Sequence, residues 1–393
     1  MKVELYEATD QNPNLKDYDE AVKNHDWQEV EKHFSWYETG KYNMAYECID
    51  KHVDDGRGDK VALHYKNGDQ KLSYTFEDMK KASNKAANVL KDEAGVEKGD
   101  RVFIFMARSP ELYFSLLGAL KIGAIVGPLF EAFMEKAVRD RLENSDAKVI
   151  ITTPELLPRI PVDDLPNLEK VVVVGDGSDD KYIDFDKSFE QASDEFEIEW
   201  LDKEDGLILH YTSGSTGQPK GVLHVQHAMV QHYISGKYVL DLKEDDVYWC
   251  TADPGWVTGT SYGIFAPWLN GATNVVVGGR FSPESWYGAI QDLSITIWYS
   301  APTAFRMLMG AGDEIVNDYD LSSLRHVLSV GEPLNPEVVK WGMKVFNLRI
   351  HDTWWMTETG AHMIVNMPAM DIKGGSMGKP LPGVEAAIID DEG

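Results

Sequence analysis

Short apolar strands that alternate with helical segments constrain the fold of this chain more than any other feature of its sequence. Apolar runs of strand length lie at residues 101–105, 124–129, 148–152 and 170–174, and segments with helical spacing lie at 76–91, 110–120 and 137–144. The runs lack strict polar–apolar alternation, so both faces of each strand are expected to be buried. The pattern predicts an α/β fold with a mostly parallel sheet that helices cover on both faces.

Length and composition indicate a well-packed but strongly acidic protein. The 393 residues include 11 tryptophans and 43% hydrophobic residues, enough for two domains or for one domain with subdomains. The 65 acidic residues exceed the 38 basic ones, which gives a formal net charge of −27. Such a field repels nucleic acids and anionic lipids, so neither is expected as a partner. A site for a polyanionic ligand would also have to be locally positive or screened by a cation such as Mg²⁺.

The cysteines and the N-terminus bear on the compartment. Cys48 and Cys250 are the only cysteines and have no metal-type spacing, which favours a reduced protein. The first residues have no apolar signal core. Residues 113–130 form the most apolar window, but Lys121 lies in its middle, so a core helix that runs into a buried strand is expected there rather than a membrane span. We therefore predict a soluble, cytoplasmic protein.

The sequence Tyr-Thr-Ser-Gly-Ser-Thr-Gly-Gln-Pro-Lys-Gly at residues 211–221 predicts a cradle for a triphosphate. Gly214 and Gly217 allow positive φ and a close approach of the backbone, whose N–H groups can then hold phosphate oxygens. Lys220 supplies a positive charge. The loop is not a Walker A motif, because Lys220 stands between proline and glycine. Further donors are the hydroxyls of Thr212, Ser213, Ser215 and Thr216.

Two other interpretations of this loop have to be weighed. A Gly/Ser-rich linker has a similar composition. The flanking residues 207–211 and 221–225 look like buried strands, however, which predicts a short loop held at both ends. A serine hydrolase is not supported, because neither Ser213 nor Ser215 lies in a Gly-x-Ser-x-Gly elbow.

Three later segments add to the pattern, although each has an ordinary structural explanation when taken alone. Residues 253–259 read Asp-Pro-Gly-Trp-Val-Thr-Gly, residues 331–335 read Gly-Glu-Pro-Leu-Asn, and residues 351–360 read His-Asp-Thr-Trp-Trp-Met-Thr-Glu-Thr-Gly. The first could form a pocket wall, the second could face a flat ring, and the third combines a carboxylate, hydroxyls and two tryptophans. Glu358 in the third segment could equally be a solvated surface residue, and paired tryptophans are more often core than ligand wall.

In this order and spacing, the four segments resemble those of the acyl-adenylate-forming superfamily, and within it the AMP-forming acetyl-CoA synthetases, in their shorter bacterial and archaeal form. The resemblance covers essentially the whole chain. It implies the large N-terminal part of that fold, with two stacked α/β subdomains, mostly parallel sheets and the start of a β-barrel-like subdomain.

The domain boundaries that follow are a wrapping segment at 1–60, a first α/β subdomain at 61–200, a second at 201–377 and the beginning of a barrel-like subdomain at 378–393. Trp27, Phe34 and Trp36 would anchor the wrapping segment. Acidic residues dominate 176–205, which predicts a solvated connection, and residues 386–389 predict a strand. The mobile C-terminal lid domain of the superfamily would lie beyond Gly393, so residues 1–393 alone are expected to be inactive or nearly so.

By the resemblance, the chain activates acetate with ATP to give acetyl-adenylate and pyrophosphate, and then transfers the acetyl group to CoA. Thr212, Thr216, Lys220, Thr357 and Glu358 would take part in catalysis, with Thr357 at the α-phosphate and Glu358 on Mg²⁺. ATP or AMP would contact residues 212–217, Lys220, Gly331, Glu332, Pro333, Asp352, Thr353, Trp354, Met356 and Thr357. Met356 stands where many relatives have glutamine, so no side-chain hydrogen bond is expected from it.

The acyl pocket would consist of Trp256, Val257, Thr258, Val330 and Trp355. An indole at Trp355 leaves room for only a very short acid, although acetate and propionate differ by one methylene, worth about 1–3 kcal/mol. CoA would pass Thr258 and Ala301, and Arg159 is a weaker candidate for its nucleotide. A propionate or other short- to medium-chain acyl-CoA synthetase is the alternative within enzymes, and a non-catalytic nucleotide-binding module is the alternative outside them.

Overall fold

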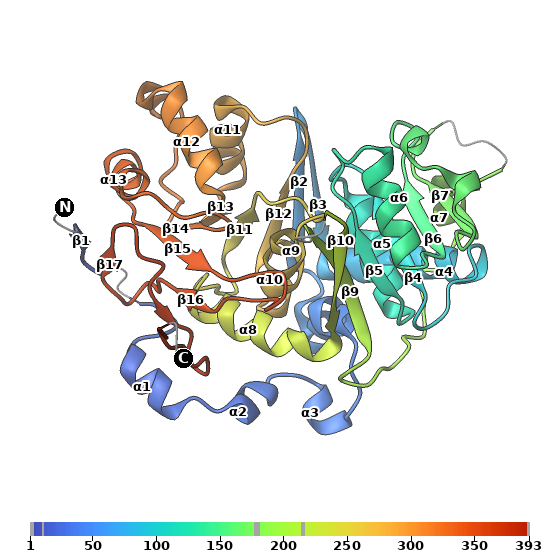
Figure 1. Ribbon diagram of the computed structural model, residues 1–393, viewed down its shortest axis with the longest axis horizontal. Helices are drawn as coiled ribbons and strands as arrows, with labels where there is room; N and C mark the ends of the chain where they lie inside the picture. The colour runs from blue at the N-terminus through green and yellow to red at the C-terminus, as the bar shows by residue number, and fades with distance from the viewer. Residues whose placement is uncertain (1–3, 10–11, 177–180, 214–216, 391–393) are drawn as a thin grey trace.

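Two large β-sheets dominate the computed structural model, which describes residues 4–9, 12–176, 181–213 and 217–390 (Figure 1). The first sheet has seven strands in the order β10-β9-β5-β4-β6-β7-β8. Neighbouring strands run parallel except for the β9–β10 hairpin, so the predicted mostly parallel sheet is confirmed. Its strands are β4 (Arg101–Phe105), β5 (Ile125–Pro128), β6 (Val149–Thr152), β7 (Lys170–Val173), β8 (Ile183–Asp184), β9 (Gly206–Ser213) and β10 (Pro219–Val225).

The helices that accompany this sheet are α4 (Phe76–Asp92), α5 (Pro110–Lys121), α6 (Glu135–Asn144) and α7 (Phe185–Gln191). Thr75 and Asp78 form a capping box that starts α4. Gly118 lets α5 pack closely on α4, because a Cβ atom there would lie 2.7 Å from the backbone nitrogen of Ala87. The acidic stretch 176–205 was expected to be a plain connection. That expectation is wrong in part, since β8 and α7 lie within it and Phe185 is buried.

The second sheet has nine strands in the order β18-β16-β15-β14-β13-β11-β12-β2-β3. The six strands from β15 to β2 run parallel, and β3, β16 and β18 are antiparallel to their neighbours. The strands are β2 (Val61–Asn67), β3 (Gln70–Thr75), β11 (Val247–Cys250), β12 (Thr273–Val277), β13 (Ile297–Ser300), β14 (His326–Ser329), β15 (Ile350–Trp354), β16 (Ile364–Val365) and β18 (Lys379–Pro380).

Helices cover both faces of the second sheet. In Figure 1, α11 (Pro283–Leu293), α12 (Pro302–Ala311) and α13 (Pro336–Val345) lie on one side of it, and α8 (Met229–Tyr238) and α10 (Ala266–Leu269) lie on the other. Alternate residues of one strand therefore join different cores: Trp298 packs with the first group, whereas Tyr299 belongs to the core that contains α8 and α10. Apart from the N-terminal helices described below, the remaining helical segments are α9 (Val257–Thr260) and the short helical turns Tyr46–Asp50, Val53–Arg57, Leu157–Arg159, Val162–Asp164, Gln226–Ala228, Ser261–Phe265 and Asp313–Asp318.

The N-terminal residues run along the outside of the molecule as α1 (Tyr18–Asn24), α2 (Trp27–Glu31) and α3 (Trp36–Thr39), and the short strand β1 (Leu5–Tyr6) pairs with β17 (Ile372–Lys373) (Figure 1). Phe34 and Trp36 are buried, as expected of anchors, whereas Trp27 is only partly buried. Trp36 stacks on Tyr42 with ring centroids 4.4 Å apart. The segment is thus attached by aromatic side chains.

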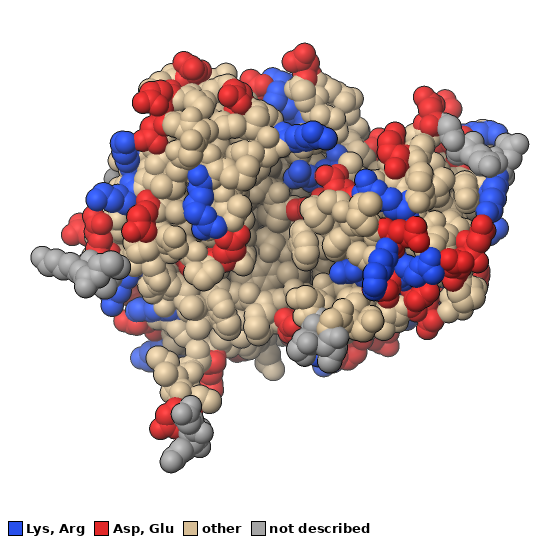
Figure 2. Space-filling model, turned by 45° about the horizontal axis from the view of Figure 1, so that its top comes forward, with Lys and Arg blue, Asp and Glu red and all other residues tan. Residues whose placement is uncertain are grey.

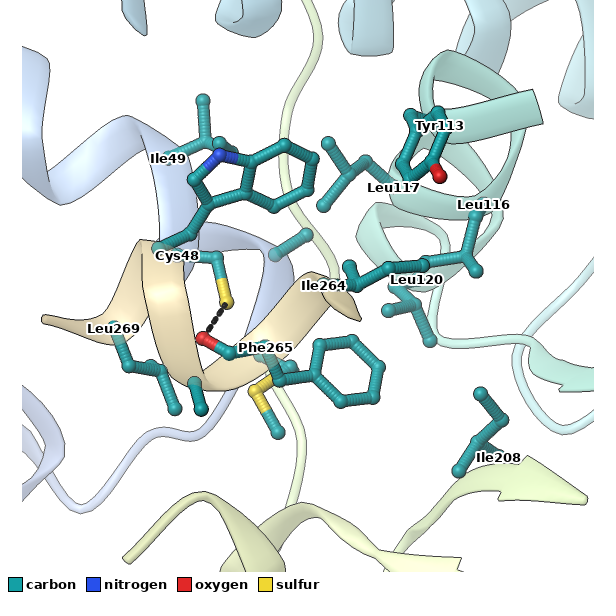
Figure 3. Close-up of a cluster of buried hydrophobic side chains, with 14 of the residues drawn as sticks. Cys48, Ile49, Tyr113, Leu116, Leu117, Leu120, Ile208, Ile264, Phe265 and Leu269 are labelled. Carbon is teal, nitrogen blue, oxygen red and sulfur yellow. Dashed lines mark hydrogen bonds between the residues drawn. The ribbon is translucent and has the colours of Figure 1, made fainter. Parts of the chain in front are cut away.

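Cys48 shows how the N-terminal segment joins the main core. Its thiol points into a cluster formed with α5 and with residues 264–269, and its Sγ lies 3.9 Å from the carbonyl oxygen of Phe265 (Figure 3). Burial raises the pKa of this thiol well above its usual value. Cys48 is therefore a packing residue rather than a nucleophile.

The strands cross the subdomain boundaries predicted from the sequence. The hairpin β2–β3 at residues 61–75 belongs to the second sheet, and the hairpin β9–β10 at 206–225 belongs to the first. The strand predicted at 386–389 is wrong, because no strand is assigned there and Ile388 and Ile389 are fully or largely exposed. Among the described residues, these positions have no neighbouring strand with which to pair.

Candidate functional site

The predicted adenine and acyl residues gather where neighbouring parallel strands of the second sheet end. In register, Cys250 of β11 pairs with Tyr299 of β13, and Ser329 of β14 pairs with both Ser300 and Asp352. The residues that follow these strands therefore lie side by side at one edge of the sheet, the usual place for a ligand site in a parallel sheet. Figure 2 shows a hollow between the two halves of the molecule, and its visible walls carry few charged side chains.

The turn at residues 356–360, here named the adenylate turn, follows β15 directly. The amides of Thr359 and Gly360 donate to the carbonyl oxygen of Met356 at 3.2 and 3.1 Å, and Gly360 has a φ of +72°. Thr357 is half-buried, whereas Glu358 is exposed and free to face a ligand. Met356 is exposed, and its thioether offers a nucleotide an apolar surface only.

Asp352 and Thr353 lie in β15 beneath the site and are both buried. The Asp352 carboxylate accepts from the amide of Thr353 at 3.1 Å, but burial outweighs this bond and raises the pKa of Asp352 to about 7. Thr353 donates its hydroxyl proton to the carbonyl oxygen of Ser329 at 2.8 Å. Trp354, the last residue of the strand, is 40% exposed.

The Gly-Glu-Pro segment after β14 is exposed at all three residues. Gly331 has a φ of +93°, which favours glycine. The carboxylate of Glu332 accepts from Thr303 at 2.6 Å and from Arg306 at 2.5 Å, and these bonds lower the pKa of Glu332. Glu332 is therefore held by α12, which leaves its backbone rather than its carboxylate to line a nucleotide. Pro333 stands beside it.

The predicted phosphate loop joins β9 to β10, and Lys220 is paired in register with Thr212. Thr212 is half-buried, whereas Ser213, Gly217 and Lys220 are exposed, and Gly217 has a φ of +83°. Gly214, Ser215 and Thr216 lie outside the described residues. The expected buried strand at 221–225 is wrong in one respect: β10 is the edge strand of its sheet, and Leu223 is half exposed.

Trp355 is the most constrained residue of the predicted acyl pocket. Its Nε1 lies 3.4 Å from the phenolic oxygen of Tyr299, and the edge of its ring meets Tyr262 with centroids 5.1 Å apart. Val330 is buried beside it at the end of β14. The indole is therefore fixed from behind by aromatic side chains of the core.

Two other residues of the predicted acyl pocket, Val257 and Thr258, lie in α9. The turn before it is tight, because a Cβ atom on Gly259 would lie 2.1 Å from the carbonyl oxygen of Asp253. Burial raises the pKa of Asp253 to about 6, although its carboxylate accepts from the amide of Gly255. Trp256 does not join Trp355. It is 47% exposed and packs against Phe130 and Phe133, which come after strand β5 of the first sheet.

The two candidates for CoA occupy different surroundings. Ala301 is half-buried at the N-cap of α12, next to the end of β13. Arg159 donates to the carbonyl oxygens of Glu131 and Phe133 at 3.0 and 3.2 Å, so its guanidinium holds the loop that packs against Trp256. This use of its donors weakens the case for Arg159 as a nucleotide ligand.

Several residues of the site were not predicted from the sequence. His210 and His224 connect the β9–β10 hairpin to the rest of the site, and Tyr262, Tyr299 and His362 support Trp355. Only the two hairpin histidines had a visible signal, as polar residues within apolar strand sequences. The aromatic residues were indistinguishable from ordinary core.

A separate cavity of about 440 Å³ lies between the N-terminal segment and α8. Its lining includes Lys51, Arg57 and Lys237 and none of the predicted site residues. Among the described residues, no group of three or more His, Cys, Asp or Glu side chains could hold a metal ion. No helix in the described ranges has the length and apolarity needed to cross a bilayer.

The comparisons with known proteins define the class. Residues 50–393 match the AMP-binding enzyme family, and the chain belongs to that family. The fold is shared with solved members: the crystal structure of Brucella canis acyl-CoA synthetase superposes with a TM-score of 0.90 at 33% identity, over 96% of this chain and 69% of that one.

Three curated relatives of this chain share one name. Acetyl-coenzyme A synthetase of Bacillus subtilis is 67% identical over 395 residues, which cover 100% of this chain and 69% of the relative. Enzymes of the same name from Mycolicibacterium smegmatis and Methanothrix thermoacetophila are 41% and 39% identical, and 89% of this chain matches 40% and 57% of their lengths. The chain thus spans about two thirds of the Bacillus subtilis protein and less of the others.

Proposed function

We propose that the chain belongs to an AMP-forming acetate–CoA ligase. The acetate carboxylate attacks the α-phosphorus of ATP, an acyl–phosphate bond forms, and the bond to pyrophosphate breaks. The thiolate of CoA then attacks the acetyl carbon and releases AMP. The protein contributes mainly by placing the reactants and neutralising charge, since ATP supplies the leaving group.

Trp355 is the observation that carries the choice of acetate. Its indole would close the end of the predicted acyl pocket, and its contacts with Tyr299 and Tyr262 support that role by fixing the ring. Val330 is buried directly after β14, and α9 would supply another wall with Val257 and Thr258. A pocket limited in this way accepts a two-carbon acid and has little room for a longer chain. The name shared by the curated relatives supports the same choice.

The nucleotide would lie across the carboxyl ends of β14 and β15. Gly331, Glu332 and Pro333 would face one side of the adenine, and Asp352, Thr353 and Trp354 would continue that wall. Residues 212–217 and Lys220 would hold the β- and γ-phosphates, because the backbone N–H groups of a glycine-containing loop and a lysine suit phosphate oxygens. Thr357 would reach the α-phosphate, with Met356 beside it.

The donors present fit Mg²⁺ bound together with the nucleotide. Glu358 offers one exposed carboxylate on the adenylate turn. Mg²⁺ is usually held by one or two carboxylates plus substrate phosphates rather than by an all-protein cage. Bound there, the ion would neutralise charge on the phosphates. CoA would approach past Thr258 and Ala301, both of which are half-buried.

Carboxylate-dependent exchange of radiolabelled pyrophosphate into ATP tests the proposal. We would use the complete open reading frame with acetate, propionate, hexanoate, benzoate and no acid. Exchange strongest with acetate supports both the adenylating half-reaction and the short pocket. Exchange with larger acids but not with acetate overturns the substrate and keeps the reaction. Absence of exchange with every acid, in protein that binds ATP, overturns the reaction and favours a nucleotide-binding module.

A further inference from the structure

Two buried histidines connect the β9–β10 hairpin by hydrogen bonds to α9 and to the adenylate turn. His210 lies on β9, two residues before Thr212, and His224 lies on β10, four residues after Lys220. They are 2% and 7% exposed, and their ring centroids are 6.1 Å apart. The pair therefore stands at the base of the predicted phosphate loop.

His224 reaches the adenylate turn. Its Nε2 lies 2.7 Å from the carbonyl oxygen of Thr357. Because a carbonyl oxygen can only accept, Nε2 carries the proton and donates. The ring also packs against Gly360, where a Cβ atom would lie 3.3 Å from the imidazole. This bond crosses from the edge strand of the first sheet to the turn that follows β15 of the second.

His210 reaches α9, which contains Val257 and Thr258 of the predicted acyl pocket and is here named the acyl wall. Its Nε2 lies 2.7 Å from the hydroxyl oxygen of Thr260, the last residue of α9. That hydroxyl donates its own proton to the carbonyl oxygen of Val257 at 3.0 Å. It must therefore accept from His210, which fixes the proton of His210 on Nε2 as well. The helix turn held in this way contains Val257 and Thr258.

Both imidazoles are neutral around pH 7. Burial, with a smaller contribution from the nearby His224, lowers the pKa of His210 to about 3. Burial also lowers the pKa of His224, against the effect of its bond to Thr357. Since both rings keep Nε2–H in the neutral form, the two bonds persist under ordinary conditions.

We propose that His210 and His224 are positioning residues that fix the described parts of the phosphate loop, residues 211–213 and 217–221, relative to the adenylate turn and the acyl wall. This inference rests on the proposed function, because it assigns the pyrophosphate leaving group to the loop and the attacking carboxylate to the wall. In-line attack requires the two to be aligned, and a misplacement of about 1 Å can cost about a hundredfold in rate. Neither histidine touches the reacting atoms, so neither is a catalytic residue.

The first test compares variants that lose or keep the donor. His224→Leu removes it, whereas His224→Gln places an amide N–H near the position of Nε2. We expect His224→Leu to lower the kcat of acetate-dependent exchange at least tenfold with less than a threefold change in the Kd for ATP. His224→Gln should recover activity to within about threefold of the unchanged protein. Equal activity of the two variants, or a fall in stability without a fall in kcat, would overturn the role of His224.

His210 allows a double-mutant cycle with its partner. His210→Leu and Thr260→Val each break the bond from one side, and each should lower kcat. If the bond is what matters, the double variant should be no slower than the worse single variant. Additive losses would overturn the assignment. His227→Leu is the matched control, because His227 also donates through Nε2, to the carboxylate of Glu31 at 2.9 Å, but lies away from the site. It should keep activity within twofold.

Amide hydrogen exchange, measured with and without ATP, tests this inference independently of the proposed reaction. In the unchanged protein, ATP should protect residues 211–221 and 356–360 together. In His224→Leu, protection of one segment should be lost while the other remains. Coupled protection without any carboxylate-dependent exchange would refute the reaction but support the positioning role. Protection that His224→Leu leaves unchanged in both segments would refute the positioning role even in an active enzyme.

Discussion

The indole nitrogen of Trp355 donates to the phenolic oxygen of Tyr299 across 3.4 Å. The donor and the acceptor of each hydrogen bond around Tyr299 follow from the chemistry of its partners. Thr353 gives its hydroxyl proton to the carbonyl oxygen of Ser329, so it accepts from Tyr299 at 2.7 Å. Tyr299 therefore donates its only hydroxyl proton to Thr353. Its phenolic oxygen accepts from both Trp355 and His362, the latter at 2.9 Å. A buried chain of hydrogen bonds thus fixes the residue that limits the acyl pocket.

Replacement of Trp355 by glycine should admit longer acids. The indole would leave a space lined by Val330 and Tyr262, into which a straight alkyl chain can extend. We expect the ratio of kcat/KM for butyrate and hexanoate to that for acetate to rise at least tenfold in Trp355→Gly, measured by pyrophosphate exchange. If neither longer acid gains relative to acetate, Trp355 does not limit the pocket.

Tyr299→Phe should weaken both stability and selectivity. The variant keeps the ring but leaves Trp355, His362 and Thr353 without their shared partner, which costs about 1–3 kcal/mol for a buried polar group left unpaired. With its indole no longer fixed, the enzyme should discriminate acetate from propionate less well than before. Urea unfolding and the ratio of kcat/KM for the two acids measure these effects. An unchanged ratio would show that packing alone holds Trp355.

The strand and helix pattern was readable from the sequence because buried parallel strands are short apolar runs. All seven elements predicted between residues 76 and 174 are present, as α4 to α6 and β4 to β7. Failures occurred where tertiary contacts decide the outcome. The first hairpin, β2–β3, crosses to the second sheet, and nothing in its local sequence specifies that partner. Phe185 turns an acidic connection into a packed helix, α7.

The site was predictable only in its motifs. Loop glycines and the order of the segments indicate a nucleotide enzyme, and the structure brings Val330, Ala301 and Trp355 to one sheet edge as parallel register requires. The supporting residues were not predictable, because a buried Tyr262 or His362 reads as core until its neighbours are known. Trp256 was grouped with Trp355 from sequence proximity to Val257, but it packs on the other half of the molecule.

Gly259→Ala should damage the acyl wall, whereas Gly310→Ala should not. A Cβ atom on Gly259 would meet backbone atoms of Asp253 and Pro254 at 2.1–2.6 Å, and neither can move without opening the turn. A Cβ atom on Gly310, in α12, meets nothing within 4 Å. We expect Gly259→Ala to lower kcat/KM for acetate at least tenfold. Gly310→Ala should raise the free energy of unfolding by about 0.5–1 kcal/mol. Equal behaviour of the two variants would contradict the geometry.

Lys121 and Asp50 form a buried ion pair that joins α5 to the N-terminal segment. The Nζ atom of Lys121 lies 2.8 Å from Asp50 and also donates to Asn84 at 2.7 Å. Burial lowers the pKa of Lys121 and raises that of Asp50, so both charges depend on each other. Lys121→Met alone should cost about 3–5 kcal/mol, and Lys121→Met with Asp50→Leu should recover much of that loss. The free energies of unfolding of both variants can be measured in urea. A double variant as unstable as the single one would contradict this account.

Buried neutral histidines should make the protein sensitive to mild acid. Burial lowers the pKa of His210 and His232 to about 3, and those of His351 and His362 fall well below the usual value. A group with a lowered folded pKa gives its full stability above the unfolded pKa of about 6.5, and this stability is lost as the pH falls below that value. Each such histidine should cost about 1.4 kcal/mol between pH 7.5 and 5.5.

Two buried carboxyls act in the opposite direction. The pKa values of Asp352 and Asp253 are raised to about 7 and about 6, so both groups destabilise the fold at high pH and cease to do so as the pH falls through those values. Together they should stabilise the fold by about 2–3 kcal/mol over the same interval, which offsets only part of the loss from the four histidines. Urea unfolding at pH 7.5, 6.5 and 5.5 measures this loss. His232→Gln keeps a donor near the carbonyl oxygen of Gly360 but removes the titration, so it should reduce the loss by about 1.4 kcal/mol. A free energy of unfolding that stays constant across this range, or a slope that His232→Gln leaves unchanged, would show that these imidazoles are not held neutral by the fold.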